Sequence, residues 1–413
     1  MGINRMDLLF DNARICDGRT PSLFSGWVGV EQGTIAAVEH RTTPPPTQAA
    51  RRLDLQQCVL MPGLIDAHVH LGLDASVNPV NFVTSLAPAE LALRMAAHAA
   101  ATLTAGVTTV RDLGCRGHVD LAVRQVVQEG LLPGPRILCA GEMICMTGGH
   151  GWQFGLEVDG QDLVRRGVRR QLKAGADIIK FMATGGVCTK GVEPGQAQLT
   201  REEMAAGIET AHLAGRKTAA HAQSLQGVKN AVAAGIDSIE HGADLDPAAL
   251  EAMVKNGVFL VPTLAAGASM IAGGTASGLE DFMVAKSQAH RSARLEGLAK
   301  AKAAGVKIAM GTDAGTPLNR HGHNVHELLE LNQAGFTPFE ALQAATVHAA
   351  ELLGFKDRLG EIAPGCIADL LIVDGNPTLD LQVLGDQERL LAVYQAGQLR
   401  SGRWFQNPGS DGL

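Results

Sequence analysis

The stretch LIDAHVH (Leu64–His70) ends a short apolar run with two histidines, His68 and His70, two positions apart. Side chains at positions i and i+2 of a β-strand point to the same side, so both imidazoles can face one ion at the end of a buried strand. An HxH pair is also common by chance. On its own it leaves open whether the histidines bind a metal or are ordinary core or surface residues.

Beyond this strand, apolar strands alternate with longer helical stretches through the middle of the chain. Repeated strand–helix units indicate parallel strands, and eight of them predict a (β/α)8 TIM-like barrel of ~250 residues. The predicted strands are Leu64–Val69, Val107–Arg111, Arg136–Ala140, Asp177–Met182, Lys217–His221, Ser238–His241, Val258–Pro262 and Val306–Gly311. The predicted helices include Ala89–Leu103, Asp162–Lys173, Glu202–Ala214 and Gln226–Ala234.

Both ends of the chain have a different pattern, with short strands separated by turn residues. We therefore expect the two ends to pair into one small β-sandwich domain, giving an α/β protein. The expected boundaries are residues 1–61 and 359–413 for the two parts of the sandwich and 62–358 for the barrel. The segment Ala265–Ser277 is expected to be a mobile loop.

The composition argues against several classes of function. The chain has 413 residues and a net charge of −7, whereas nucleic-acid-binding surfaces are usually basic. No apolar run reaches the ~20 residues that span a bilayer, and the first residues do not resemble a secretory signal. The seven cysteines are scattered and form no CxxC pair, which favours reduced thiols. We expect a cytoplasmic protein that binds neither membranes nor nucleic acids.

Polar residues lie at the ends of four other predicted strands, namely Lys180, His221, His241 and Asp313. The carboxyl ends of barrel strands converge on the active-site mouth, so these groups meet the two histidines of the first strand. Burying them together is costly unless they are paired or bind a metal. Histidines with a carboxylate form the usual nitrogen and oxygen ligand set of Zn²⁺.

Lys180 admits two interpretations. Its aliphatic stem can pack in the interior while its ammonium reaches solvent or an ion-pair partner. Alternatively, desolvation leaves the amine uncharged, and the amine then reacts with CO₂ to give an anionic carbamate that can bridge two cations.

Six motifs occur in order along nearly the whole chain. They are PGLIDAHVH (62–70), IIKFMATGGV (178–187), AHA (220–222), SIEHG (238–242), GTDAG (311–315) and PGCIADLLIVDGNP (364–377). Together they make the chain resemble the amidohydrolase superfamily, in its binuclear-metal branch.

This resemblance implies a role for each strand-end residue. His68 and His70 hold the more buried metal, His221 and His241 hold the second, and carboxylated Lys180 bridges the two. Asp313 ligates the buried metal and acts as general base and proton shuttle. The implied cofactors are two divalent ions, with Zn²⁺ expected, and the implied reaction is attack of a metal-bridging hydroxide on an amide carbonyl.

Particular residues distinguish the branches of the superfamily. Gly72 stands where dihydroorotases have an arginine, and no glutamate follows His221 as in cytosine-deaminase-like members. Phosphotriesterase-like members usually lack the sandwich domain. The motifs MTGGHG (146–151), ATGGV (183–187) and NRHG (319–322) are closest to the Xaa-Pro dipeptidase-like and zinc-dependent arginine carboxypeptidase-like group. Some relatives in that group cleave the amide of ochratoxin, an N-acyl phenylalanine.

Four further residues are candidates for substrate binding. His150 lies in a glycine-rich loop and is expected to contact substrate or the transition state. Arg320 could bind a substrate carboxylate with two hydrogen bonds or form a structural ion pair, and His321 is its neighbour. Gln223 occupies the position where dipeptidase-like relatives have a carboxylate-binding tyrosine, which puts a proline-specific activity in doubt.

We therefore predict a metal-dependent hydrolase that releases the C-terminal amino acid from dipeptides or N-acyl amino acids. Trp152 and Phe154, after His150, could line an apolar pocket or pack within the loop. A cyclic-amide, carbamate or lactone hydrolase on the same scaffold is the alternative, and a metal-free scaffold protein is the non-enzymatic one. The resemblance also implies a homo-oligomer.

Overall fold

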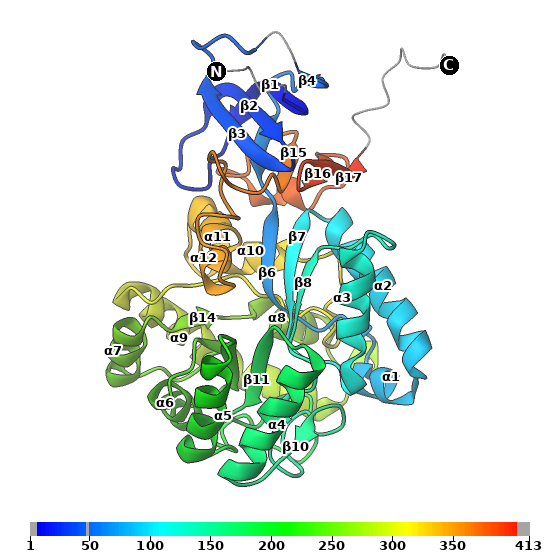
Figure 1. Ribbon diagram of the computed structural model, residues 1–413. Helices are drawn as coiled ribbons and strands as arrows, with labels where there is room; N and C mark the ends of the chain where they lie inside the picture. Colours follow the sequence, from blue (N-terminus) through cyan, green and yellow to red (C-terminus); the bar gives the residue numbers. More distant parts are fainter. Residues whose placement is uncertain (1–5, 47–48, 403–413) are drawn as a thin grey trace.

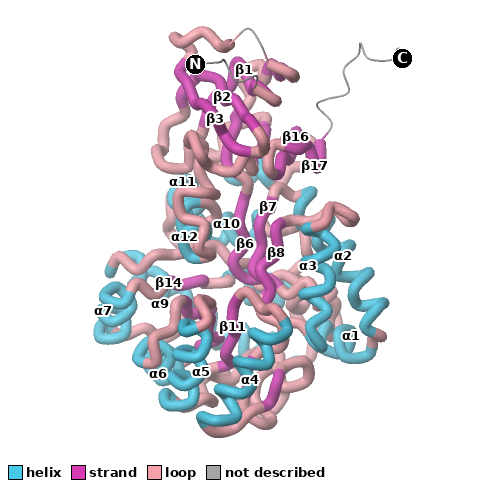
Figure 2. Tube along the Cα trace, viewed as in Figure 1, coloured by secondary structure: helices cyan, strands magenta, loops and turns pink. Residues whose placement is uncertain are grey.

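The structure is a computed structural model that describes residues 6–46 and 49–402 (Figure 1). It has two parts, a barrel surrounded by helices and a small β domain at one end of the barrel. Both ends of the described chain lie in the β domain, as Figure 2 also shows. This is the α/β architecture that the sequence predicts.

The small β domain is built from both ends of the chain. Its sheet has the order β17-β16-β15-β5-β1-β2-β3, with β4 paired to β1. The antiparallel pair of β5 and β15, in which Leu60 lies opposite Ile372, joins the two ends and confirms their predicted pairing. The strands are β1 (Leu8–Ile15), β2 (Phe24–Glu31), β3 (Thr34–His40), β4 (Arg52–Asp54), β5 (Val59–Pro62), β15 (Leu370–Val373), β16 (Leu390–Gln395) and β17 (Gln398–Gly402).

Parallel strands form the barrel, as predicted. The eighth predicted strand, Val306–Gly311, is irregular, yet it closes the ring. The amide of Ala309 donates to the carbonyl of Leu260 at 3.0 Å, and the amide of Ala67 donates to the carbonyl of Met310 at 2.9 Å. The regular strands of this region are β6 (Leu64–Val69), β7 (Val107–Asp112), β8 (Arg136–Cys139), β9 (Ile144–Cys145), β10 (Leu156–Glu157), β11 (Ile178–Met182), β12 (Lys217–Ala222), β13 (Ser238–His241) and β14 (Phe259–Val261).

Helices cover the outside of the barrel, and the four that the sequence predicts lie within one residue of their predicted ends. Thr200 and Glu203 form a reciprocal capping box that fixes the start of α5. The helices are α1 (Pro79–Ser85), α2 (Pro88–Thr104), α3 (Val119–Gln128), α4 (Gln161–Ala174), α5 (Arg201–Leu213), α6 (Leu225–Ala233), α7 (Pro247–Asn256), α8 (Leu264–Gly273), α9 (Asp281–Ala304), α10 (Val325–Gln333), α11 (Pro338–Ala344) and α12 (Val347–Leu352). Short 3₁₀ helices span Arg116–His118, Thr275–Ser277 and Leu381–Leu384.

The expected mobile loop at Ala265–Ser277 is wrong. These residues form α8 and the 3₁₀ turn Thr275–Ser277. Alanine has the highest intrinsic helix propensity. In addition, the carboxylate of Glu327 accepts from the first amides of α8, Leu264 N at 2.9 Å and Ala265 N at 2.7 Å. The cap comes from a residue more than sixty positions away, so the local composition did not reveal it.

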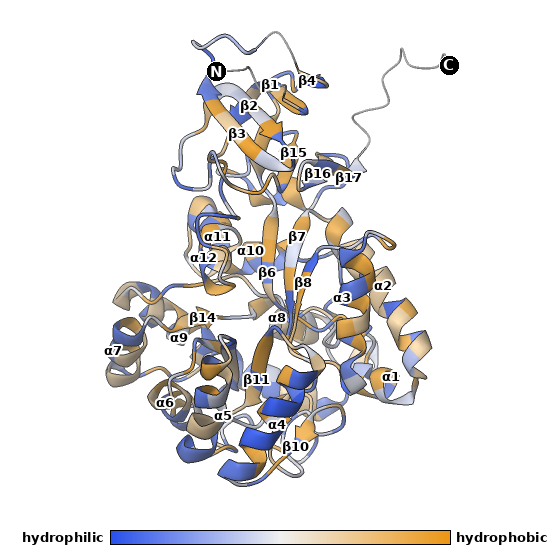
Figure 3. Ribbon diagram, in the orientation of Figure 1, coloured by the Kyte–Doolittle hydropathy of each residue, from blue (hydrophilic) through white to orange (hydrophobic). Residues whose placement is uncertain are grey.

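The distribution of hydropathy agrees with this architecture. In Figure 3, hydrophobic residues follow β6 through the interior, whereas hydrophilic residues cover α4 on the outside. Every residue of β6, β7 and β11 is buried, which gives the strand-end side chains a rigid base. None of the helices in residues 6–46 and 49–402 is both long enough and apolar enough to cross a membrane.

Candidate active site

The six residues that the sequence singles out at the strand ends meet in one place. A cavity of about 80 Å³ lies at the carboxyl ends of the barrel strands. Two of the six have left-handed backbone, at φ 73° for His241 and φ 59° for Asp313, which turns the chain sharply where the strand ends. The cavity is lined by His68, His70, Lys180, His221, His241 and Asp313.

His68, His70 and Asp313 form the tightest part of this cluster. One carboxylate oxygen of Asp313 lies 3.3 Å from His68 Nε2 and 3.4 Å from His70 Nε2. The ligand atoms of the three side chains lie within 4.8 Å of one another, so they could hold one metal ion. Two imidazole nitrogens and one carboxylate oxygen are a donor set that suits zinc.

Each of these two histidines has its other ring nitrogen engaged. His68 Nδ1 contacts a carboxylate oxygen of Glu240 at 2.8 Å, and His70 Nδ1 contacts the carbonyl of Gly114 at 3.1 Å. Both partners are acceptors, so each Nδ1 carries the proton. Each Nε2 then has a free lone pair directed towards Asp313. Outer partners of this kind fix the tautomer of metal-binding histidines.

His221 and His241 lie side by side, with ring centroids 4.4 Å apart. His221 uses the opposite nitrogen from the others: its Nε2 donates to the carbonyl of Gly185 at 2.9 Å, which leaves Nδ1 free. His241 Nδ1 contacts the hydroxyl of Thr263 at 2.6 Å, which leaves Nε2 free. Both rings therefore also have one nitrogen available for a ligand in the cavity.

Lys180 lies among these histidines with only 1% of its surface exposed. Its Nζ has no hydrogen-bond partner in the described part of the chain. Burial lowers the pKa of this amine to about 8. A buried polar group without a partner is costly, so it indicates a missing ligand.

Burial also keeps the imidazoles uncharged. It lowers the pKa of His68 and of His70 to about 4, and the positive charge of Lys180 acts in the same direction. The pKa values of His221 and His241 are lowered well below the usual range, again mainly by burial. Neutral imidazoles are the form that binds metals.

A buried ion pair supports His68 from behind. The second carboxylate oxygen of Glu240 accepts from Arg111 Nη2 at 2.8 Å and from the hydroxyl of Ser238 at 2.6 Å. Arg111 Nε also donates to the carbonyl of Ala67 in β6. Although burial opposes ionisation of Glu240, the nearby Arg111 charge and the His68 contact hold its pKa at about 2. Glu240 is thus an ionised acceptor that orients His68.

Two predicted substrate-binding residues also line the cavity. His150 Nδ1 contacts the hydroxyl of Thr189 at 2.7 Å, and its ring lies 4.5 Å from that of His221. Gln223 is buried, and its amide oxygen has no partner among the described residues. Phe154 lines the same cavity, whereas Trp152 is 46% exposed and does not.

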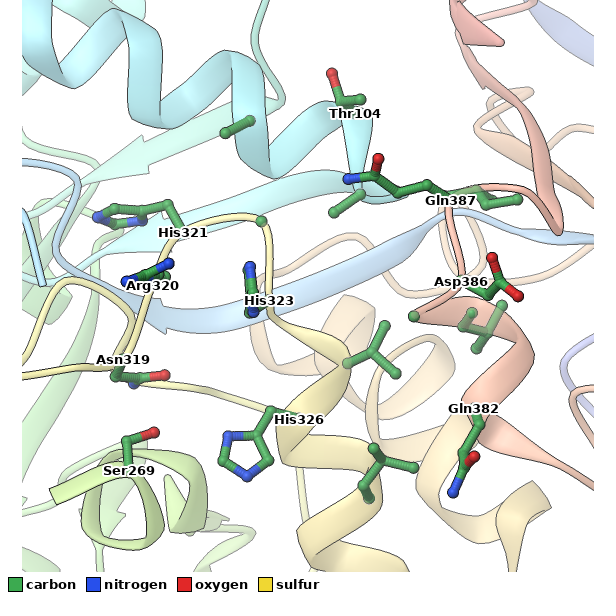
Figure 4. Close-up of a pocket in the computed structure, with 18 of the residues that line it drawn as sticks. Thr104, Ser269, Asn319, Arg320, His321, His323, His326, Gln382, Asp386 and Gln387 are labelled. Atoms are coloured by element: carbon green, nitrogen blue, oxygen red, sulfur yellow. The ribbon is translucent and has the colours of Figure 1, made fainter. Parts of the chain in front are cut away.

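Arg320 and His321, the other two residues predicted to bind substrate, do not line this cavity. They line a separate pocket of about 1020 Å³ (Figure 4). His321 Nε2 donates to the carbonyl of Leu73 at 2.9 Å, so this ring braces the loop after His70. Between Asp313 and Arg320 the chain turns with left-handed backbone at Leu318, and sequence proximity to Asp313 was therefore a poor guide.

Sequence reasoning missed Arg294, a buried side chain of α9 that lines the metal-binding cavity. It also gave no role to the Arg111–Glu240 pair. No sequence pattern marked either of them. Arg294 lies within a 24-residue polar helix far from any strand end. Arg111 and Glu240 come from separate strands, so their pairing is not visible in the sequence.

Comparison with known proteins shows to which family the chain belongs. The pattern of the Amidohydrolase family matches residues 59–400. The chain belongs to the amidohydrolase family. It is 31% identical to ochratoxinase from Aspergillus niger over 392 residues, covering 88% of this chain and 78% of that protein.

Solved structures of amidohydrolases have the same fold. One crystal structure of an amidohydrolase superposes with a TM-score of 0.89 at 33% identity, covering 96% of this chain and 99% of that one. A Xaa-Pro dipeptidase with bound methionine in its active site superposes with a TM-score of 0.87 at 32% identity, covering 95% and 99%. These similarities confirm the predicted dipeptidase-like group and identify this chain as a hydrolase.

Proposed function

We propose that this amidohydrolase is a binuclear zinc enzyme that releases the C-terminal amino acid from dipeptides or N-acyl amino acids. One observation carries the proposal. Four neutral histidines and a carboxylate surround a buried lysine that has no partner among the described residues. Such a cluster has unused ligand atoms on every side of one cavity.

The residues present fit two cations. His68, His70 and Asp313 would hold one, and His221 with His241 would hold the other, through the ring nitrogens that their outer partners leave free. When bound, two divalent ions would lower the pKa of a water molecule between them and polarise a substrate carbonyl.

Lys180 would link the two sites after carboxylation. Its uncharged amine and CO₂ give a carbamate with one negative charge and release one proton. This reaction replaces a buried amine that lacks a partner with an anion between two cations, which offsets the cost of burying either alone. The low pKa of Lys180, caused by burial, favours the reactive uncharged amine.

Asp313 would manage the proton. Its side chain is partly exposed to the cavity and lies next to both histidines of β6. In amide hydrolysis, water adds to the carbonyl carbon and the C–N bond breaks. Asp313 would accept the proton of the attacking water and deliver it to the leaving nitrogen, which departs as an amine. His150, beside His221 in the wall of the cavity, would donate a hydrogen bond to the carbonyl oxygen as charge develops there.

The choice of substrate rests on the relatives and on the cavity walls. One relative is an ochratoxinase and one similar structure is a Xaa-Pro dipeptidase with methionine bound. The cavity has apolar walls formed by Phe154, Met182 and Met270, among others. We therefore expect a substrate with a bulky apolar group next to the scissile amide.

A ninhydrin screen tests the proposal. The enzyme is loaded with Zn²⁺ and bicarbonate and given dipeptides and N-acyl L-amino acids that vary at the C-terminal residue. Lys180→Ala serves as the blank. Lys217→Ala serves as the matched control, because the side chain of Lys217 is 43% exposed at the start of β12, away from the end of that strand that carries His221. We expect one class of amino acid to be released by the wild-type and control proteins and not by Lys180→Ala.

Metal and carbamate are measured on the same samples. We expect two zinc ions per wild-type chain, and a carbamate signal from ¹³C-bicarbonate in the NMR spectrum that Lys180→Ala lacks. No release across the panel, with two metals bound, would reject the peptidase-like activity in favour of cyclic amides, carbamates or lactones. Absence of bound metal would reject the binuclear site itself.

A further inference from the structure

Arg294 lies in the wall of the catalytic cavity without an anionic partner. Its side chain projects from α9 and is only 9% exposed. The described residues contain one other arginine buried to this degree, Arg111, and that one is paired with the carboxylate of Glu240 at 2.8 Å. A buried cation without a partner is strongly unfavourable, so Arg294 requires an explanation.

The hydrogen bonds of Arg294 involve one end of its guanidinium. Nη2 donates to the carbonyls of Pro262 and Thr263 at 2.6 and 2.8 Å and to the hydroxyl of Thr263 at 2.7 Å. Nε is buried and has no partner among the described residues, and none of them accepts from Nη1 either. Both edges of a guanidinium that bind a carboxylate with two parallel hydrogen bonds include Nη2, which is already used, so Nη1 is the group that can still donate to a ligand.

The two carboxylates that act electrostatically on Arg294 already contact other groups. Glu327 and Asp313 both act on it electrostatically, but neither forms an ion pair with it. The two oxygens of Glu327 accept from the amides of Leu264 and Ala265 at the start of α8. Asp313 faces the histidines of β6. Among the described residues, the protein therefore supplies no anion for Nη1 of Arg294.

Nη1 lies beside a glycine, Gly267 of α8. A Cβ atom placed on Gly267 would lie 3.3 Å from Nη1, a tight contact. The absence of a side chain at Gly267 therefore leaves Nη1 uncovered on this side. Arg294 also lines the same cavity as Asp313, His241 and Gln223.

We propose that Arg294 binds the carboxylate of the substrate and restricts this enzyme to amides whose leaving amine bears a free carboxylate. This assignment rests on the proposed function and names the residue that selects its substrates. The carboxylate accepts a charge-assisted hydrogen bond from Nη1, inside a site from which water is largely excluded. A substrate with a neutral C-terminal carboxamide leaves the cation unpaired and is rejected.

Binding is measured by isothermal titration calorimetry of the zinc-loaded enzyme with N-acetyl-L-phenylalanine and N-acetyl-L-phenylalaninamide, and hydrolysis of both is followed with ninhydrin. We expect the wild type to bind the carboxylate compound at least tenfold more tightly, equivalent to about 1.4 kcal/mol. Arg294→Met should reduce the preference to threefold or less, and Arg294→Lys should retain part of it. Arg291→Met, on the same helix but paired with Glu330, is the matched control and should retain all of it.

The two proposals fail in different ways. Equal binding of acid and amide by the wild type overturns the role of Arg294, even if no variant folds. Full preference in a folded Arg294→Met protein with wild-type zinc content overturns it too. A clear preference in calorimetry without hydrolysis of any amide supports the role of Arg294 and rejects the proposed function instead.

Discussion

Replacing Glu240 by glutamine tests whether the ion pair behind His68 holds the site together. The substitution preserves the shape of the side chain and removes its charge. Glu240 has no exposed surface, and it contacts Arg111, Ser238 and His68 at 2.8, 2.6 and 2.8 Å. The glutamine leaves Arg111, which is 1% exposed, as a buried cation without an anionic partner.

The expected cost follows from that geometry. Breaking one side of a buried ion pair typically costs roughly 3–5 kcal/mol of folding free energy. Glutamine has one acceptor oxygen, so Arg111 and His68 can no longer each have their own acceptor. The orientation of His68 is weakened as a result, and outer partners of metal-binding histidines are typically worth about 10–100-fold in metal affinity. Glu330→Gln is the matched control, because Glu330 pairs at 3.0 Å with Arg291, whose side chain is 33% exposed. We expect that change to cost about 1 kcal/mol or less.

Two assays separate the effects. Urea unfolding of the metal-free proteins, followed by circular dichroism, measures stability. Titration of zinc against a competing chelator measures affinity. A Glu240→Gln protein that unfolds within about 1 kcal/mol of the wild type and binds zinc equally well would refute the reasoning, because the pair would then be neither a structural nor an orienting element.

Three other predictions concern metal, pH and space. Chelation of the metals should lower the melting temperature of the protein, and added zinc should restore it. Free zinc at about a thousand times its dissociation constant stabilises the folded protein by about 4 kcal/mol. A melting curve that chelation leaves unchanged would contradict a metal site. Burial lowers the pKa of His321 to about 3 from 6.5. The unfolded chain therefore binds the proton first, and stability should fall from pH 6.5 towards pH 3, by roughly 2 kcal/mol from this residue at pH 5. The slope of urea stability against pH should be shallower in His321→Gln, and an equal slope would be evidence against this assignment. Gly186→Ala places a Cβ against the His150 ring and should lower kcat/KM at least tenfold. The Cβ of the control Gly195→Ala meets no atom within 4 Å, so its kcat/KM should equal that of the wild type. Equal kcat/KM values for the two variants would mean that His150 has no fixed role.

Much of the fold was readable from the sequence because its signals are local. Short apolar runs between glycines specify barrel strands, and this pattern predicted strands such as β6 and β11 within a residue or so. The prediction was less accurate where contacts between residues far apart in the sequence determine the local structure. Val306–Gly311 closes the barrel without regular strand geometry, and α8 depends on a cap from Glu327.

The residues of the site were predicted or missed for the same reasons as the elements of the fold. Strand periodicity brings His68, His70 and Lys180 to one cavity, since His68 and Lys180 lie on buried strands and His70 directly follows the end of β6. Residues in loops and on outer helices have no such rule. Arg320 follows Asp313 closely in sequence but lies in another pocket, whereas Arg294 comes from a helix with no visible relation to the strand ends.

The junction of β5 and β6 has a consequence for the biogenesis of this enzyme. Only Gly63 separates these strands, so the strand with the first two histidines continues directly from one that pairs with β15. The partners Leu60 and Ile372 are more than 300 residues apart. During translation β5 therefore lacks this neighbour until nearly the whole chain has left the ribosome. We expect β5 and the adjoining β6, and with them the placement of His68, to be stabilised only once β15 has emerged.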